Sequence, residues 1–287
     1  MTNRRGWLAM DRCSSVAMLG ARSARRRERS ALGFRSVAWI VIVAAASVTA
    51  APVRAELIGL YRFDNPSDLG LDTSGKGNHA TNVGAASTAG FQGGGAYLDG
   101  STYLRSPIDV STATLPLMTW GAWAKPDGTQ PIKTVLTGDN GNFDRGMTID
   151  ARGGGGVAWS TFTGAGVVSS GVSPSTSAWT FLAAVYDQSL STMTFYVNDQ
   201  SVVVSTAFGG SHTFFDMGHN PDFGEFFHGS LDNVFVYDQA LTSLEIAAIR
   251  TDGFPLNAVP EIDPGSAERV MTLLAGTLVL LGRHRRM

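Results

Sequence analysis

The stretch Phe227–Ile249, FHGSLDNVFVYDQALTSLEIAAI, predicts a strand, a turn and a short helix in succession. Residues Leu231–Asp238 follow the two-residue period of a β-strand, and both faces of that strand are apolar except at Asp232. A carboxylate inside such a strand costs free energy unless hydrogen-bond donors or a metal ion partner it. Thr242 stands at the N-cap of the helix, and Glu245 follows three residues later, as a capping box requires.

The chain from residue 56 to residue 253 repeats this strand-and-turn pattern. About twelve short strands with regularly spaced turn residues precede the single helix, which is typical of a β-sandwich. Asp99-Gly100 and Asn198-Asp199 each mark a hairpin turn. Glycine is abundant, with 34 residues, and charged residues are sparse, which also favours β-structure over helices. We therefore predict one all-β domain over residues 56–253, built as a sandwich of two antiparallel sheets.

Charge is unevenly distributed along the chain. Residues 1–55 contain ten arginines against two acids, whereas residues 56–260 contain eight basic residues against nineteen acidic ones. An acidic body argues against nucleic acid as a partner, because phosphates require a positive surface. The only cysteine is Cys13, so the body contains no disulfide.

Residues 1–55 are predicted to be an export signal that begins with a basic region and continues as a short apolar helix. The run Val37–Ala51 is apolar, and Val53-Arg54-Ala55 fits the small-residue rule for signal peptidase, which is the first expected partner. A basic arm that binds nucleic acid is the alternative for the leader, but the apolar run behind the arginines favours export.

Residues 254–287 form a linker and a hydrophobic tail in this interpretation. The apolar run Val270–Gly282 is followed by a basic cluster that ends in Arg285 and Arg286. Because the apolar residues are contiguous and precede a basic stop, we expect a tail helix that anchors the chain transiently in a membrane before processing. A core or amphipathic helix is the alternative.

The body resembles the laminin G-like branch of the concanavalin A-like jelly-roll superfamily. The resemblance rests on six pieces in the expected order: LYRFD from Leu60, DTSGKGNHA from Asp72, YLDGSTYL from Tyr97, MTWGAWAKPDG from Met118, WTFLAAVYDQSLSTMTFYVND from Trp179 and GSLDNVFVYDQALTSLEIAAI from Gly229. The resemblance implies a jelly-roll sandwich and a carbohydrate-binding function.

The tail resembles a PEP-CTERM sorting signal. The motif is Val259-Pro260-Glu261-Ile262-Asp263-Pro264, with Ile262 at a position where the commonest form has proline. This resemblance implies processing by an exosortase near Pro260-Glu261, and export to the cell envelope or extracellular matrix of a bacterium with an outer membrane, where such proteins often accompany exopolysaccharide.

Calcium is the metal that the jelly-roll resemblance implies. By that resemblance, Asp72, Asn78 and Asp232 occupy the ligand positions. Oxygen donors of this kind suit Ca²⁺, and a glycine-rich loop can supply backbone carbonyls as further ligands. In the alternative, Asp72 and Asn78 form Asx-turns and Asp232 is satisfied by backbone N–H groups. The loop Gly138–Asp144 is also rich in oxygens but lacks the spacing of an EF-hand.

Aromatic side chains are the candidate carbohydrate ligands, because sugars stack on aromatic faces. In the strand Leu117–Lys125, Trp120 and Trp123 lie on opposite faces, so we expect one in the core and Trp123 toward a groove. Trp159 is the second candidate. Five loop phenylalanines are also considered: Phe214, Phe215, Phe223, Phe226 and Phe227. For every one of these residues a place in the core is the alternative.

Catalysis is not predicted. Glycosidases use a pair of carboxylates about 5 Å apart, and the body contains only Glu56, Glu225 and Glu245, none in a paired pattern. We therefore predict a non-catalytic surface or matrix protein that binds carbohydrate. A structural or adhesive protein that binds another protein is the alternative, followed by a hydrolase that acts on polysaccharide.

Overall fold

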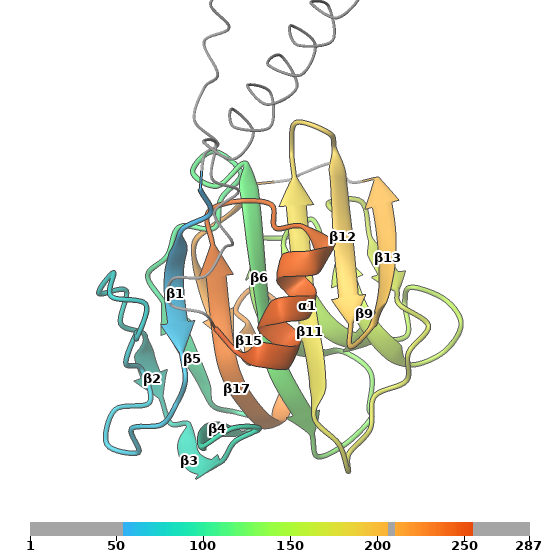
Figure 1. The fold of residues 1–287 in the computed structure, drawn as a ribbon. Coiled ribbons are helices and arrows are strands. Elements are labelled where there is room, and N and C mark those ends of the chain that lie inside the picture. Colours follow the sequence, from blue (N-terminus) through green and yellow to red (C-terminus); the bar gives the residue numbers. More distant parts are fainter. Residues whose placement is uncertain (1–53, 206–209, 255–287) are drawn as a thin grey trace, which may run out of the picture. The chain divides into compact units, whose positions relative to one another are not determined.

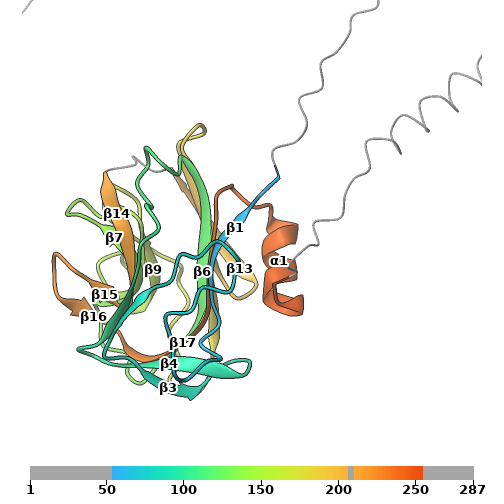
Figure 2. The ribbon, with the colours of Figure 1, turned by 90° about the vertical axis from the view of Figure 1, so that its left-hand side faces the viewer.

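The computed structural model describes residues 54–205 and 210–254. Within these residues the chain forms two sheets packed face to face, with one helix on the outer face of one sheet (Figures 1 and 2). This confirms the predicted all-β jelly-roll sandwich. Most of the export signal, the tail helix and the sorting motif Val259–Pro264 lie outside the described residues.

Sheet A contains eight strands among the described residues, in the order β13-β12-β11-β6-β17-β4-β3, and β1 also pairs with β17. Its strands are β1 (Leu57–Tyr61), β3 (Ala86–Ala89), β4 (Gly94–Asp99), β6 (Leu117–Pro126), β11 (Thr180–Asp187), β12 (Thr192–Val197), β13 (Gln200–Ser205) and β17 (His228–Tyr237).

Sheet B contains nine strands within the described part of the chain, in the order β10-β9-β8-β7-β14-β5-β2, with β16 joining β15 to β7. Its strands are β2 (Thr81–Val83), β5 (Tyr103–Ser106), β7 (Lys133–Asp139), β8 (Gly146–Asp150), β9 (Ala158–Phe162), β10 (Val167–Ser169), β14 (Ser211–Met217), β15 (His219–Asn220) and β16 (Glu225–Phe226). The contact of β16 with β7 is parallel, whereas the other strand pairs described here are antiparallel.

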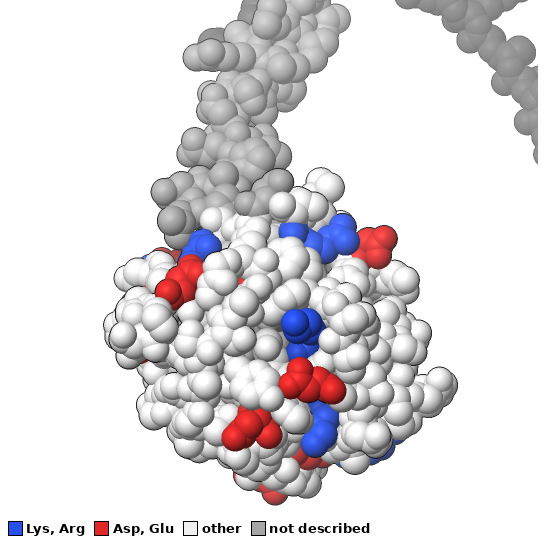
Figure 3. Space-filling model, turned by 90° about the horizontal axis from the view of Figure 1, so that it is seen from below, with Lys and Arg blue, Asp and Glu red and all other residues white. Residues whose placement is uncertain are grey.

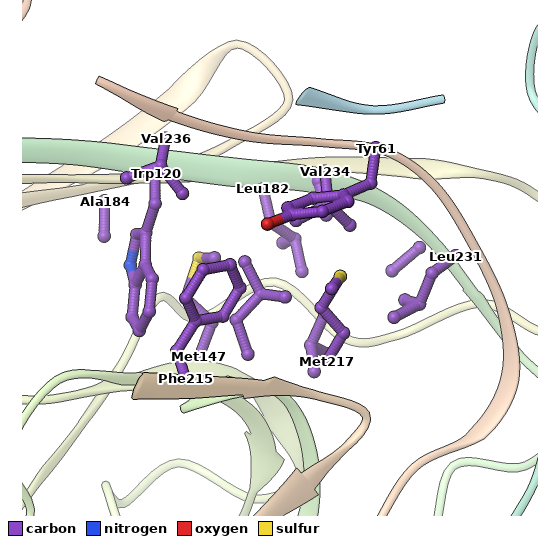
Figure 4. Packing of buried hydrophobic residues seen from close by; sticks show 14 of the residues in the cluster. Tyr61, Trp120, Met147, Leu182, Ala184, Phe215, Met217, Leu231, Val234 and Val236 are labelled. Carbon is purple, nitrogen blue, oxygen red and sulfur yellow. The ribbon is translucent and has the colours of Figure 1, made fainter. Parts of the chain in front are cut away.

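The core between the sheets is aromatic at its centre (Figure 4). Trp120 of sheet A meets Phe215 of sheet B edge-on, with ring centroids 5.6 Å apart, and Tyr61 contacts the same ring at 6.4 Å. The buried Tyr61 hydroxyl donates to Ser106 Oγ at 2.7 Å, so its polar end has a partner. Burial raises the pKa of Tyr61 and keeps the phenol neutral.

The strand β17 departs from strict alternation at Asp232 and Asn233. Leu231, Val234 and Val236 all point into the core, although the first two are three residues apart. The pairing with β6 shifts register between Asp232 and Phe235, and Asn233 adopts a positive φ of 48°. This β-bulge moves the apolar residues after it to the opposite face from the one that simple alternation predicts.

Helix α1 (Ser243–Asp252) covers the outer face of sheet A (Figure 2). Its predicted capping box is present: Thr242 Oγ1 accepts from the Glu245 backbone N–H, and Glu245 Oε2 accepts from the Thr242 backbone N–H at 2.7 Å. A second apolar cluster beneath the helix includes Phe181, Phe235 and Ile246. Gly121 of β6 makes room for it, because a Cβ there would lie 2.3 Å from the Phe235 ring.

Of the two predicted hairpins, one is present in the structure and the other is not. Asn198-Asp199 joins β12 to β13 with Val197 opposite Gln200, which confirms a hairpin. Asp99-Gly100 instead joins β4 of sheet A to β5 of sheet B. That prediction is wrong because the turn carries the chain across the sandwich, and the local sequence does not reveal which sheet the next strand joins.

The surface seen in Figure 3 carries acidic and basic side chains interspersed among uncharged ones, so that face has no continuous basic patch among its described residues. Of the helices in residues 54–205 and 210–254, none has the length and apolar character needed to span a bilayer.

Candidate functional site

Asp232 is fully buried in β17, beside the glycine-rich turn between β3 and β4. Its Oδ2 atom accepts a hydrogen bond from the Gln92 backbone N–H at 2.9 Å, whereas its Oδ1 atom has no hydrogen-bond partner. The turn approaches closely because Gly90 has no side chain, and a Cβ there would lie 2.7 Å from Asp232 Oδ2. The backbone N–H groups of Asn233 and Phe91 also favour the charged form, but Oδ1 itself makes no hydrogen bond.

The electrostatic state of Asp232 follows from this burial. Loss of solvation, with a smaller contribution from the nearby Asp64 carboxylate, raises the pKa of Asp232 to about 7. A cation beside the free Oδ1 would oppose both effects. Asp232 and Asp64 are therefore the residues that could hold a calcium ion, with backbone carbonyls or water as the remaining ligands. Among the described residues, no three His, Cys, Asp or Glu side chains are grouped to hold a metal by themselves.

Asp72 and Asn78 lie together, and their hydrogen bonds suit a structural role. Asp72 Oδ1 accepts from the backbone N–H groups of Leu60 and Ser74, and Oδ2 accepts from the Asn78 backbone N–H at 2.9 Å. These bonds lower the pKa of Asp72 despite its burial. The Asn78 side chain donates to the Ile58 carbonyl oxygen at 2.7 Å.

The predicted metal ligands are divided by strand β1. Tyr61 pairs with Asp72 on one side and with Val234 of β17 on the other, so Asp72 and β17 lie along opposite edges of this strand. The acid that lies near Asp232 is Asp64, which precedes Asp72 by one loop. The prediction that Asp72 and Asp232 face a common ion is therefore corrected: the bonds of Asp72 match the Asx-turn alternative.

The two predicted ligand-binding tryptophans occupy different environments. Trp159 is fully buried in the core between the sheets and presents no surface to a ligand, so this assignment is corrected. Trp123 is half-buried on the outer face of sheet A, opposite Trp120, as the alternation predicts. Phe91 stacks on it with ring centroids 3.5 Å apart and an angle of 11°. One face of Trp123 is thus already covered by a protein side chain.

A cavity of about 120 Å³ lies beside sheet B, where strands β7, β9, β15 and β16 contribute residues to its wall. Its lining combines polar and aromatic side chains and consists of Asp139, Gly141, Phe143, Arg152, Phe162, Asn220, Phe223 and Glu225. We call it the sheet B pocket.

A hydrogen-bond network fixes the polar residues of the sheet B pocket. Asn220 Nδ2 donates to Asp139 Oδ2 and to Glu225 Oε2, both at 3.1 Å. Arg152 Nη2 lies 3.3 Å from Glu225 Oε1 and 2.6 Å from Asp150 Oδ2. The Asn220 Oδ1 atom has no partner, although Asn220 is only 1% exposed. This oxygen is enclosed by the protein, and the other amide and carboxylate groups of the lining are held by the hydrogen bonds above.

Three phenylalanines provide the aromatic part of the lining. Phe143 packs edge-on against Phe162 with ring centroids 5.6 Å apart, and the Arg152 guanidinium lies 5.4 Å above the Phe143 ring. Phe223 is 55% exposed, so its ring is open to a ligand. Aromatic and polar groups in one lining are the combination that small-ligand sites use.

Some residues of this pocket can be found from the sequence. Phe223 was among the candidate aromatics, and Asp139 and Phe143 belong to the oxygen-rich loop Gly138–Asp144. The other loop phenylalanines are divided between roles: Phe215 and Phe227 are core residues, Phe214 lies under Arg105, and Phe226 stacks on His219. Arg152 and Glu225 were not predicted, because no local spacing connects segments that meet only through sheet pairing.

The sequence matches the family described as the Concanavalin A-like lectin/glucanases superfamily over residues 92–247, just over half of the chain. The chain therefore belongs to this superfamily. No match was found among curated proteins.

Solved structures share the fold at low sequence identity. Domain 4 of AbnA, a GH43 extracellular arabinanase from Geobacillus stearothermophilus solved with arabinotriose, aligns with a TM-score of 0.57 and 22% identity, over 69% of this chain and 100% of that one. The binding domains of Paraclostridial Mosquitocidal Protein 1 and botulinum neurotoxin serotype D align with TM-scores of 0.54 and 0.52, at 14% and 12% identity. The alignments cover 70% and 69% of this chain but only about half of those two chains, 53% and 52%. These likenesses show a shared fold.

The buried Asp232 predicts a pH-dependent stability. Its pKa is about 7 in the folded state and near 3.8 when unfolded, so between these values the folded chain holds a proton that the unfolded chain has lost. In chelator, the free energy of unfolding should therefore fall as pH rises from 4 to 7, with a slope from this group approaching about 1.4 kcal/mol per pH unit. Urea titrations of Asp232→Asn should show this component removed; identical pH slopes in both proteins would contradict the assignment.

Proposed function

We propose that this chain is an exported, non-catalytic protein that binds carbohydrate in the sheet B pocket. The observation that supports the proposal is a cavity lined by polar and aromatic side chains, with an open aromatic ring at Phe223. Sugars present hydroxyl groups that suit a polar lining and C–H groups that stack on such rings. The superfamily includes lectins, and the arabinanase domain of the same fold was solved with a bound arabinotriose, both of which support this proposal.

The binding test compares Phe223→Ala with Trp123→Ala. We expect the wild-type protein to bind at least one oligosaccharide on a glycan array, with arabinotriose included as a probe. Phe223→Ala should lower that affinity about tenfold through lost stacking, with little change in melting temperature because the ring is exposed. Trp123→Ala should lower the melting temperature, because Phe91 and Phe181 pack against the indole, and should leave the affinity unchanged.

Two outcomes would favour the alternatives. Binding to no glycan would favour a structural or adhesive protein. Loss of binding in Trp123→Ala alone would move the ligand to the outer face of sheet A. The same samples should release no reducing ends from a bound polysaccharide; release that is lost in Glu225→Gln would make the protein a hydrolase.

Calcium at Asp232 is the second part of the proposal. The free Oδ1 atom of Asp232 and the nearby Asp64 carboxylate support it. Because a ligand of the folded state raises stability, chelator should lower the wild-type melting temperature by about 5 °C relative to excess Ca²⁺. Asp232→Asn should abolish this difference.

Asp72→Asn is the matched control for calcium binding. It weakens the hydrogen bonds to Leu60 and Ser74, so it should lower the melting temperature equally with and without Ca²⁺. A wild-type melting curve that is unchanged by chelator would refute a calcium site, and loss of the calcium response in Asp72→Asn would restore the original ligand set.

Export and sorting complete the proposal, and they rest on the sequence of residues 1–55 and 254–287. Signal peptidase would remove the leader, and an exosortase would cut near Pro260-Glu261 after transient anchoring by the tail. Intact-mass spectrometry of protein recovered outside the producing cell should find a chain without the Val270–Gly282 run. A double substitution of Pro260 and Glu261 by alanine should retain the tail; a full-length wild-type chain outside the cell would contradict processing.

A further inference from the structure

We infer that strand β13 pairs with β13 of a second copy of this chain, so that sheet A continues across a two-fold dimer. The inference concerns the edge of sheet A and does not depend on the sheet B pocket. β13 ends the strand order of sheet A, with β12 on one side and no described strand on the other. Figure 1 shows it at the edge of the sheet, to the right of α1.

The β13 edge lacks the features that usually prevent an edge strand from pairing. Such strands are commonly very short, bulged, or interrupted by charged residues or proline. The strands at the other three ends of the two strand orders, β3, β2 and β10, contain four, three and three residues. β13 contains six, Gln200–Ser205, without charge or proline, and it pairs with β12 in unbroken register. It is therefore the described edge best suited to accept another strand.

The hydrogen bonds of β12 fix the direction of the backbone groups in β13. The Asn198 N–H donates to the Phe181 carbonyl oxygen at 2.8 Å, and Val197 lies opposite Leu182 of β11. In an antiparallel pair this bond belongs to a position where the facing residues do not bond each other, so the N–H and C=O of Val197 point to β13. There Val197 lies opposite Gln200 and forms a hydrogen-bonded pair with it.

The outward backbone groups of β13 follow from this pairing. Hydrogen-bonded and non-bonded pairs alternate along an antiparallel ladder. Val202 and Val204 therefore bond to β12, whereas the N–H and C=O groups of three residues point away from it: Ser201, Val203 and Ser205.

These outward groups are complementary to those of an antiparallel second copy. With Val203 opposite the second copy's Val203, Ser201 lies opposite Ser205 and Ser205 lies opposite Ser201. Each of these three pairs can exchange two backbone hydrogen bonds, because each residue presents one donor and one acceptor. The same residues supply both sides of the contact, so it closes as a two-fold dimer and leaves no further edge for a third copy.

The side chains of β13 support the same register. Val203 is 66% exposed and lies opposite Thr194 of β12, so its methyl groups gain a partner when the second copy's Val203 lies about 5.5 Å away across the axis. Val202 and Val204 face the other way and pack against the core between the sheets. Each would lie opposite the other in the second copy, which extends this apolar layer across the contact.

Charge favours a second copy at this edge. The body of the chain is acidic, with eight basic against nineteen acidic residues in positions 56–260, so two copies repel each other over much of their surface. Residues 192–205, which form β12 and β13, contain one charged residue, Asp199 in the turn. Asp199 is four residues from Val203, which separates the two copies of this carboxylate by about 27 Å along the strands. Physiological salt screens charges at that distance.

The two-fold axis has a consequence for binding. The axis between two antiparallel strands of one sheet is perpendicular to that sheet, so both copies present sheet B to the same side. If the proposed carbohydrate site is correct, the dimer has two sites facing one polymer surface, and its avidity exceeds the affinity of a single site. The dimer itself is tested without any carbohydrate.

The first experiment measures self-association of the purified full-length chain by sedimentation velocity between about 5 and 500 µM. We expect a monomer–dimer equilibrium with a Kd of about 50 µM, as a small interface gives. Val203→Pro should raise this Kd at least about tenfold, because it removes an outward N–H. Its melting temperature should change little, since that N–H does not bond to β12.

The second experiment tests the register by exchanging charge at the axis. Val203→Lys and Val203→Glu should each be monomeric, because each places like charges directly opposite one another. An equimolar mixture of the two should form a mixed dimer at least about tenfold more tightly than either variant alone. Val83→Lys is the matched control, because it makes the same change at a 40% exposed valine of edge strand β2, and it should leave the Kd unchanged.

Three outcomes would overturn the inference. A wild-type chain that remains monomeric at 500 µM would exclude the dimer. A dimer that persists in Val203→Pro would place the contact elsewhere, since all other parts of the chain are the same in every variant. A mixture of the Lys and Glu variants that stays monomeric would contradict the pairing of Val203 with itself, and melting curves of both variants show that each is folded.

Discussion

The β-bulge at the buried carboxylate of Asp232 sets the register of strand β17, which lies at the centre of sheet A. β17 pairs with β1, β4 and β6, so any change in its register would propagate to three neighbours. The bulge at Asp232 and Asn233 lets Leu231 and Val234 both enter the core, while Phe235 turns outward to meet helix α1. The strand thus serves two apolar clusters, and the uncompensated Asp232 Oδ1 lies at the point where they change sides.

The outer faces of the two sheets differ in their side chains and in what covers them. That of sheet A is apolar around Phe181 and Phe235 and is covered by α1, whose capping box fixes where the helix begins. Sheet B instead has a cavity bordered by carboxylates, an amide and phenylalanines. Helix α1 covers sheet A and leaves the polar groups near this cavity uncovered.

Local patterns predicted those parts of the structure that depend on neighbours in sequence. The alternation in β6 correctly separated Trp120 from Trp123, and the spacing of Thr242 and Glu245 correctly gave the helix cap. These patterns gave wrong predictions where the answer depended on which sheet a strand joins. From the sequence alone, Trp159 could lie in the core or on the surface, and only the position of strand β9 shows that it is buried. Asp99-Gly100 has the composition of a hairpin turn, although it joins two different sheets.

The sequence by itself determined the fold class, because the period of two, the turn residues and the capping box are local properties that hold in any all-β arrangement. The sequence also indicated that the Asp232 carboxylate requires hydrogen-bond donors or a metal ion as a partner. Only the tertiary structure decided that Asp64, and not Asp72, lies near it, since strand β1 separates Asp72 from β17. The sheet B pocket likewise arises only on folding, because Asp139, Arg152 and Glu225 come from distant segments that strand pairing brings together.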